Sequence, residues 1–229
     1  MFRLALNAGH YLGTPGKRCL KELDPKETRE WVLNSRIADL VEMRLQSYTG
    51  YELVRTDDAT GQKNITLANR VKTANNFKAD FYLSIHHNAG IDGGDGGGIC
   101  VYTYTNPLPA ATQWQQELYA ALIDKTGLKG NRANPLPRAN LQELRETTMP
   151  AVILELGFMD SRTDVPVILT DAYAQQCAEA IVDILIRRGN LQKREEKLCR
   201  VQVGAFSKKE NAEALVRALR GDGYEAVIL

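Results

Sequence analysis

Apolar residues along the chain fall into short runs and into longer stretches where they recur every three or four positions. The short runs are typical of strands. Two of them, 81–86 (FYLSIH) and 149–158 (MPAVILELGF), are apolar almost throughout, as in strands that are buried on both faces of a parallel sheet. The strands expected on this basis are 3–8, 51–58, 81–86, 99–105 and 149–158.

The longer stretches predict helices. In residues 30–46 the apolar side chains fall near one face of a helix. Asn64 or Thr66 is the expected N-cap of a second helix, and Gly127 is the expected end of a third, where glycine is favoured because it readily adopts the left-handed conformation. The expected helices are 30–46, 64–79, 112–127 and 172–188.

Strands and helices alternate along the chain with connections long enough to cross from one strand to a parallel neighbour. This order predicts an α/β fold, with a mainly parallel twisted sheet flanked by helices. Three segments are too polar or too rich in glycine and proline for regular structure, and we expect them to be loops: 11–28, 88–98 and 128–148.

Composition changes after the last helix and predicts a domain boundary. Residues 1–189 form the main domain, and residues 190–198 (NLQKREEKL) read as a charged linker. In 199–229 a strand, a helix capped by Ser207 and a second strand are expected, which gives a small C-terminal βαβ unit. A unit this short buries little core on its own and needs a partner surface.

Charge and cysteine content exclude several classes of protein. The chain has 229 residues, with 29 basic and 28 acidic side chains, so no overall positive field favours nucleic acid or an anionic membrane. The four cysteines, at 19, 100, 177 and 199, show no CxxC spacing, which favours free thiols in a reducing compartment.

We find no features of a membrane anchor or of a signal peptide in the sequence. No apolar stretch approaches the ~20 residues that span a bilayer, and MFRLALNAGH does not resemble a signal peptide. We therefore expect synthesis in the cytoplasm without a cleavable leader.

The candidate catalytic residues lie at or near the ends of predicted strands. Of the three histidines, His10 follows the first strand and His86 closes the third, while Glu155 lies near the end of the last. The carboxyl ends of parallel strands share one edge of a sheet, where ligands bind. Two imidazoles and a carboxylate are the ingredients of a catalytic zinc site. The alternatives are ordinary turn or core histidines and, for Glu155, a structural salt bridge.

These motifs resemble the zinc-dependent N-acetylmuramoyl-L-alanine amidases of the amidase type 3 family over residues 1–188. The matching segments are LALNAGH, EWVLN, SIHHNA and, as the longest, LRETTMPAVILELGF. The family's usual DPGHGG is NAGHYL in this chain, which changes the first loop but keeps its histidine.

The resemblance implies a role for each matching residue. It implies that Zn²⁺ binds to His10, Glu30 and His86 and that Glu155 is the catalytic carboxylate. Glu30 is chosen over Glu22 and Glu27 through the resemblance and the spacing to Asn34; without it, a solvated glutamate in the first turn of a helix is an adequate account.

Other residues are candidates for contacts outside the metal site. His87 is not expected to be a ligand, because successive residues of a strand point to opposite faces. Asn88 and Arg145 are candidates for substrate contacts, Arg145 with a carboxylate of the stem peptide; a surface arginine is the alternative for the latter.

The implied reaction is hydrolysis of the amide between the lactyl group of N-acetylmuramic acid and L-alanine in peptidoglycan. Zinc would activate water, and Glu155 would take its proton and pass it to the leaving amine. Two alternatives stay open: a non-catalytic protein that binds cell wall, and a zinc peptidase or deacetylase that acts on another bond.

The C-terminal residues resemble half of a SPOR repeat, a module associated with binding the glycan strands of peptidoglycan. Because a complete module uses two halves, we expect two chains to pair through this unit as a homodimer. Without an export signal, we expect one of two routes to the wall: the protein is a phage-type lysin that escapes through membrane holes, or it is an enzyme released when a sporulating mother cell lyses.

Overall fold

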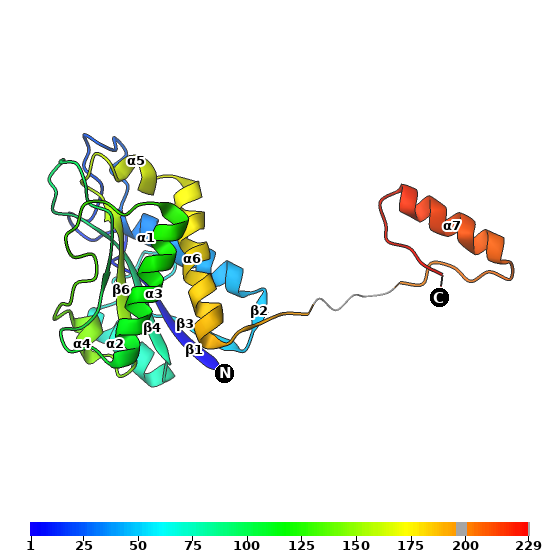
Figure 1. Ribbon diagram of the computed structural model, residues 1–229, viewed down its shortest axis with the longest axis horizontal. Helices are drawn as coiled ribbons and strands as arrows, with labels where there is room; N and C mark the ends of the chain where they lie inside the picture. Colours follow the sequence, from blue (N-terminus) through cyan, green and yellow to red (C-terminus); the bar gives the residue numbers. More distant parts are fainter. Residues whose placement is uncertain (196–200, 229) are drawn as a thin grey trace. The chain divides into compact units, whose positions relative to one another are not determined.

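The computed structural model describes residues 1–195 and 201–228, which belong to two units, Met1–Arg194 and Glu195–Leu229 (Figure 1). The first unit contains, in chain order, β1 (Phe2–Ala8), α1 (Glu30–Leu45), β2 (Tyr48–Thr49), β3 (Tyr51–Arg55), α2 (Leu67–Phe77), β4 (Phe81–Asn88), β5 (Ile99–Tyr102), α3 (Pro109–Thr126), α4 (Gln142–Glu146), β6 (Ala151–Phe158), α5 (Val165–Ile168), α6 (Asp171–Gly189) and β7 (Gln192–Lys193). The second unit contains α7 (Lys209–Gly221).

The main sheet has five strands in the order β3-β1-β4-β6-β5. All neighbours are parallel except β5, which is antiparallel to β6. A parallel return needs a long crossover, usually a helix. The glycine-rich loop 89–98 between β4 and β5 contains none, so β5 runs in the opposite direction. The prediction of a mainly parallel sheet flanked by helices is confirmed.

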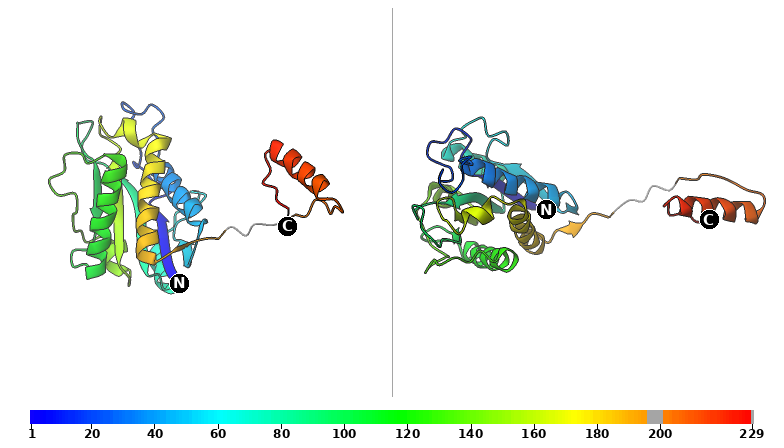
Figure 2. Two further views of the ribbon diagram at one scale, coloured as in Figure 1. Left: turned by 45° about the vertical axis from the view of Figure 1, so that its right-hand side comes forward. Right: turned by 90° about the horizontal axis from the view of Figure 1, so that it is seen from above.

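Helices cover both faces of this sheet. On one face α1, α6 and α3 lie side by side, as Figure 2 shows, and pack against alternate strand residues such as Leu6, Leu83 and Leu154. On the other face a smaller apolar cluster around Tyr82 packs near α2 and α4. The strands are therefore buried on both sides, which explains their near-continuous apolar runs.

Several predicted helix ends are found as expected. Thr66, and not Asn64, is the N-cap of α2, with its hydroxyl accepting a hydrogen bond from the Asn69 N–H at 3.3 Å. Gly127 ends α3 in the left-handed conformation, with φ of 68°. The predicted loop 128–148 contains the five-residue helix α4, which is too short to show a periodic pattern.

The predicted linker 190–198 lies partly in the first unit. Gln192 and Lys193 form β7, which pairs with Thr49 and Tyr48 of β2 in a two-stranded sheet. A ladder of two residues on each side is too short to be read from the sequence. Residues 196–198 of the predicted linker lie outside the described residues.

The second unit differs from the predicted βαβ arrangement. Its helix α7 is present, but residues 201–206 and 224–228 of the predicted strands form no sheet ladder; residues 199, 200 and 229 lie outside the described part of the chain. Ser207 is not the N-cap, because α7 follows Lys208 and has no side-chain cap. An isolated pair of short strands lacks the partners that stabilise a sheet.

Three of the four cysteines lie in the part of the chain that the structure describes. Cys19, Cys100 and Cys177 are free and buried, whereas Cys199 is outside the described residues. Across residues 1–195 and 201–228, we find no helix with the length and apolar character needed to cross a bilayer.

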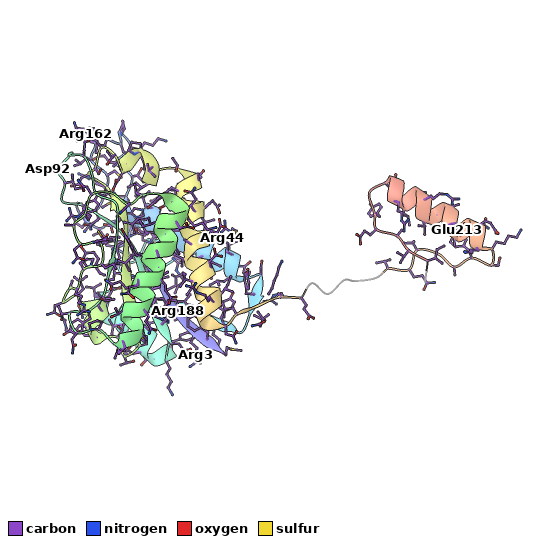
Figure 3. All side chains as sticks on the ribbon, in the orientation of Figure 1. Arg3, Arg44, Asp92, Arg162, Arg188 and Glu213 are labelled. Atoms are coloured by element: carbon purple, nitrogen blue, oxygen red, sulfur yellow. The ribbon has the colours of Figure 1, made fainter. Side chains whose placement is uncertain are left out.

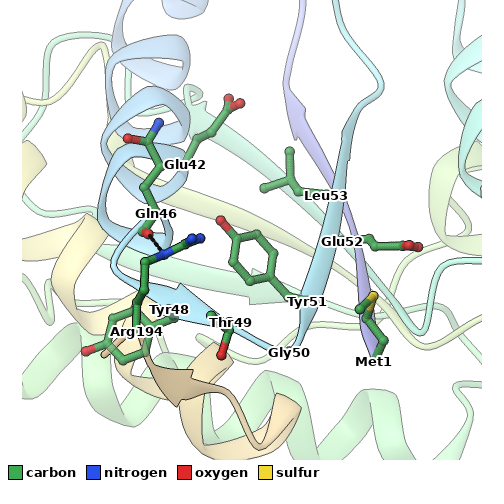
Figure 4. Close-up of a pocket in the computed structure, with 10 residues that line it drawn as sticks. All are labelled: Met1, Glu42, Gln46, Tyr48, Thr49, Gly50, Tyr51, Glu52, Leu53 and Arg194. Carbon is green, nitrogen blue, oxygen red and sulfur yellow. Dashed lines mark hydrogen bonds between the residues drawn. The ribbon is translucent and has the colours of Figure 1, made fainter. Parts of the chain in front are cut away.

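A hollow of about 460 Å³ lies at the amino-terminal end of β3 (Figure 4). Tyr51 projects into it between Glu42 and Leu53, and Arg194 closes one side with its Nε donating to Gln46 O at 3.2 Å. In Figure 3, Arg3 of β1 marks this end of the first unit, and Asp92, in the loop that follows the carboxyl end of β4, marks the opposite end.

Candidate active site

Three of the predicted residues meet at the carboxyl edge of the sheet. His10 follows β1, Glu30 is the first residue of α1, and His86 lies near the end of β4. One ligand atom from each lies within 4.8 Å of the others. His10 Nε2 is 3.2 Å from Glu30 Oε2, and His86 Nδ1 is 3.1 Å from Glu30 Oε1. Residues 76 positions apart along the chain, His10 and His86, thus share one carboxylate.

Glu30 is fully buried and ionised. Burial alone would raise its pKa, but hydrogen bonds from His10 and His86 and their charges outweigh burial and hold the pKa well below its usual value. The His87 N–H also donates to Glu30 Oε1 at 3.2 Å, and Lys17 Nζ lies 3.7 Å from Oε2. A carboxylate in this state is ready to bind a cation.

His86 presents one nitrogen for a further contact. Its Nδ1 is taken up by Glu30, while Nε2 is buried and has no hydrogen-bond partner among the described residues. Burial lowers the pKa of His86, but Glu30 more than offsets this and raises it above the usual value. When Nδ1–H donates to Glu30, Nε2 keeps the lone pair that a metal requires.

His87 points away from this cluster, as expected for the next residue of a strand. It is buried, and burial lowers its pKa to about 3, so its ring is neutral. Its Nδ1 lies 2.8 Å from Asn34 Oδ1 on α1, and Asn34 Nδ2 donates to Gly9 O at 3.2 Å. Since an amide oxygen only accepts, Nδ1 carries the proton. His87 and Asn34 therefore fix α1 against the start of the first loop.

Glu155 stands next to His86 in the sheet. The two residues are direct partners in the parallel pairing of β4 and β6, so their side chains lie on the same face. Burial raises the pKa of Glu155 to about 7, the charge of Glu30 adds to this, and His86 and Lys17 act against it. Its Oε2 is buried and without a hydrogen-bond partner among the described residues. A carboxylate with a pKa near neutrality can both take and give a proton.

The cluster fits a bound divalent metal. His86 Nε2 is a buried polar atom without a hydrogen-bond partner in the described chain, a costly state unless a ligand completes it. Glu30 Oε2 faces His10 Nε2 at 3.2 Å and Lys17 Nζ at 3.7 Å, so two cationic or metal-ligating groups already converge on this oxygen. Two imidazoles and one carboxylate are a donor set that zinc uses in catalytic sites, where three protein ligands leave a position open.

The two predicted substrate-binding residues, Asn88 and Arg145, are not part of the His10, Glu30 and His86 cluster. Asn88 ends β4, two residues after His86, and its Oδ1 accepts from the Ala89 N–H at 2.9 Å. The Arg145 guanidinium on α4 donates to Asn140 Oδ1 at 2.7 Å and to Glu146 Oε1 at 2.9 Å, both neighbours in the sequence. Glu27, the rejected alternative to Glu30, pairs with Arg18 at 3.0 Å.

Sequence reasoning missed a buried polar group beneath the site. Asn7, Arg70 and Glu143 are all at most 5% exposed and are linked by hydrogen bonds. The only sequence signal for them is the polar character of Asn7 inside the apolar run of β1, because the other two come from distant helices. Lys17, in the loop after His10, was also not singled out.

The fold and the rim of the sheet define a class of α/β protein with a His-Glu-His cluster and an adjacent buried glutamate. Residues 4–187 match the N-acetylmuramoyl-L-alanine amidase family, and residues 195–228 match the SPOR domain. The chain belongs to the N-acetylmuramoyl-L-alanine amidase family, and the activity that this match supports is that of a peptidoglycan amidase.

Named relatives agree with this assignment. The chain is 30% identical over 205 residues to the N-acetylmuramoyl-L-alanine amidase CwlM of Bacillus licheniformis, covering 89% of this chain and 76% of the relative. It is 31% identical over 185 residues to the sporulation-specific N-acetylmuramoyl-L-alanine amidase of Bacillus subtilis (strain 168), covering 80% and 68%.

Solved structures share the fold. The catalytic domain of CwlV, an N-acetylmuramoyl-L-alanine amidase from Bacillus (Paenibacillus) polymyxa var. colistinus, aligns with a TM-score of 0.73 at 24% identity. The alignment covers 84% of this chain and all of that domain. The mainly parallel sheet flanked by helices is therefore the architecture of this family.

Proposed function

We propose that the chain is a zinc-dependent amidase that cleaves the bond between the lactyl group of N-acetylmuramic acid and L-alanine in peptidoglycan. His10, Glu30 and His86 would hold the metal, and Glu155 would be the general base and acid. The observation that carries this proposal is the His10, Glu30 and His86 cluster at one edge of the sheet, beside buried His86 Nε2 and Glu155 Oε2 atoms that find no hydrogen-bond partner among the described residues. Which bond is cut is inferred from membership of the amidase family.

Each protein group has a distinct task in this proposal. Bound Zn²⁺ would supply Lewis-acid polarisation of the scissile carbonyl and activation of water. Glu155 holds its side chain on the same face as His86, where it accepts the proton of the attacking water and delivers it to the leaving amine. Glu30 holds the His86 ring through Nδ1, which leaves the buried Nε2 without a partner among the described residues.

Substrate contacts belong to the same proposal. Asn88 ends the strand that carries His86 and offers its amide Nδ2 to a carbonyl of the substrate. For Arg145, binding to a carboxylate of the stem peptide means exchanging the exposed contact with Glu146, which is weak because both side chains are solvated.

Product analysis of defined muropeptides tests the reaction directly. We expect mass spectrometry to show free N-acetylmuramic acid ends and peptides that begin with L-alanine. Activity should disappear after treatment with a strong chelator and return when Zn²⁺ is added. Cleavage within the stem peptide, or loss of the acetyl group instead, would favour the zinc peptidase or deacetylase alternative. Intact muropeptides together with wall binding would favour a non-catalytic protein.

For the second unit we propose pairing between two chains. None of the α7 residues is buried, and the apolar Leu215, Val216 and Leu219 recur on one side of the helix. Val201 and Tyr224, on either side of α7, are 80% and 66% exposed. Exposed apolar surface on a unit this small is stabilised when a second copy covers it. The match to the SPOR domain suggests that the paired units bind peptidoglycan.

Sedimentation measurements test the pairing. At micromolar concentration we expect a dimer of the 25.5 kDa chain, and Leu215→Glu should shift it to the monomer by placing a charge in the apolar contact. Arg217→Glu on the exposed side of α7 is the matched control and should leave the dimer intact. A wild-type chain that sediments as a monomer contradicts the proposal.

A further inference from the structure

Arg70 is a buried cation whose hydrogen bonds all go to uncharged oxygens. The residue is 2% exposed and comes from α2. Its Nε donates to Ile65 O at 2.9 Å, its Nη1 to Ala8 O at 2.8 Å and its Nη2 to His10 O at 2.7 Å. Its Nη1 also donates to the side chain of Asn7. Burying a charge is costly, so an arginine in this position calls for a reason beyond packing.

Three of these acceptors belong to the segment that leads from β1 into the first loop. His10, at the end of this segment, has φ of 66°, the left-handed region that residues other than glycine seldom occupy. Such a conformation persists only when surrounding contacts impose it. The guanidinium donates hydrogen bonds to the carbonyl oxygens of Ala8 and His10, one on each side of Gly9. These bonds stabilise the turn that places the His10 ring beside Glu30.

A carboxylate balances the Arg70 charge through an intervening amide. Asn7 Oδ1 accepts from Arg70, and Asn7 Nδ2 donates to Glu143 Oε1 at 3.2 Å and to Ser84 Oγ at 2.8 Å. Glu143 is 5% exposed and also accepts from the Tyr82 hydroxyl. An amide that accepts from a cation and donates to an anion is polarised by both, which strengthens each hydrogen bond.

We propose that Arg70 is a positioning residue for the metal centre, acting through the His10 backbone and balanced by Glu143 through the Asn7 amide. This inference rests on the proposed zinc site. The competing explanation is that Arg70 only ties α2 to the sheet, in which case its loss would lower stability and leave metal binding unchanged. The two explanations differ in metal affinity, which is measurable without turnover.

Metal titration of the Arg70→Met variant separates the two. We expect the affinity for Zn²⁺, measured by competition with a chromophoric chelator, to fall by about 10- to 100-fold, the usual effect of losing a group that orients a ligand. The absorption spectrum of the Co²⁺-loaded chain should change because the His10 ligand is no longer held. Unchanged Zn²⁺ affinity together with an unchanged Co²⁺ spectrum would overturn the proposal.

Arg188→Met is the matched control. Arg188 on α6, labelled in Figure 3, pairs with Glu117 at 2.9 Å and packs over Trp114, on the face of the sheet away from Asn7 and Arg70. This variant loses an arginine that joins two helices, as Arg70→Met does for a helix and a strand. Its Zn²⁺ affinity and Co²⁺ spectrum should equal those of the wild type.

If Arg70→Met does not fold, a pair of variants that moves the negative charge from Glu143 to position 7 tests the proposal instead. Asn7→Asp keeps the acceptor for Arg70 but sets two carboxylates against each other at Glu143, so Zn²⁺ affinity should fall. Adding Glu143→Gln moves the negative charge next to Arg70 and restores a donor, and the double variant should recover most of the affinity. Equal affinities in the single and double variants would count against the amide bridge.

The outcome for the wild type separates this proposal from the proposed function. If the wild-type chain binds Zn²⁺ no more tightly than a His86→Ala variant, the metal centre itself is wrong. If the wild type binds tightly and Arg70→Met binds equally well, the metal centre stands and only the role of Arg70 fails.

Discussion

Glu155→Gln is expected to lower turnover of purified peptidoglycan by roughly 10²- to 10⁴-fold, the contribution of a positioned general acid and base. The amide has the shape of the carboxylate but cannot take a proton from water. Because Glu155 lies beside the His10, Glu30 and His86 cluster without bonding to its atoms, Zn²⁺ should bind to the variant as it does to the wild type. The measurement is the rate of release of L-alanine-ended peptides alongside zinc content per chain.

Glu52→Gln is the matched control for this change. Glu52 is an exposed glutamate of β3 that pairs with Arg3 at 2.8 Å, and its replacement should leave turnover within about twofold, since exposed ion pairs contribute little. Turnover by Glu155→Gln at the wild-type rate would reject Glu155 as the proton carrier. Loss of zinc along with turnover would instead assign Glu155 to the metal.

Much of the fold follows from local sequence patterns. The apolar runs 81–86 and 149–158 predict β4 and β6 because both faces of these central strands are covered by helices. The small sheet of β2 and β7 was not predicted, since each of its strands has two residues. The direction of β5 depends on a short glycine-rich loop passing over β6, a property of the chain path that residue patterns do not encode.

Some residues of the candidate site can be predicted from the sequence and others cannot. Strand ends predict His10, His86 and Glu155, because the edge shared by parallel strands is a property of the topology. Glu30 begins a helix, where a solvated glutamate is equally natural, and only the family resemblance selected it. No local sequence pattern predicts the contacts of Arg70 and Glu143 with Asn7, because these residues are separated from Asn7 by 63 and 136 positions of the chain. Contacts at that separation are set by tertiary packing.

The glycine before His10 is a second position where the structure predicts a large effect. Gly9 is packed against the His86 imidazole, and a Cβ at this position would lie 2.0 Å from His86 Cε1 and 2.3 Å from Nε2. No real contact is that short, so the ring must move. His86 Nδ1 lies 3.1 Å from Glu30 Oε1, and a displaced ring would lose that contact and its place in the proposed metal site.

Gly9→Ala is therefore expected to bring activity down to the level of His86→Ala, with Zn²⁺ affinity reduced by at least about 10-fold. Overpacking of this kind also costs about 1–3 kcal/mol of folding stability, which leaves most domains folded. Thermal unfolding and zinc titration of the same sample separate a displaced ligand from an unfolded chain. Gly221→Ala, where an added Cβ meets no atom within 4 Å, should change neither quantity. Wild-type zinc affinity in a folded Gly9→Ala chain would show that His86 is not a metal ligand, since the methyl group and the ring cannot occupy the same space.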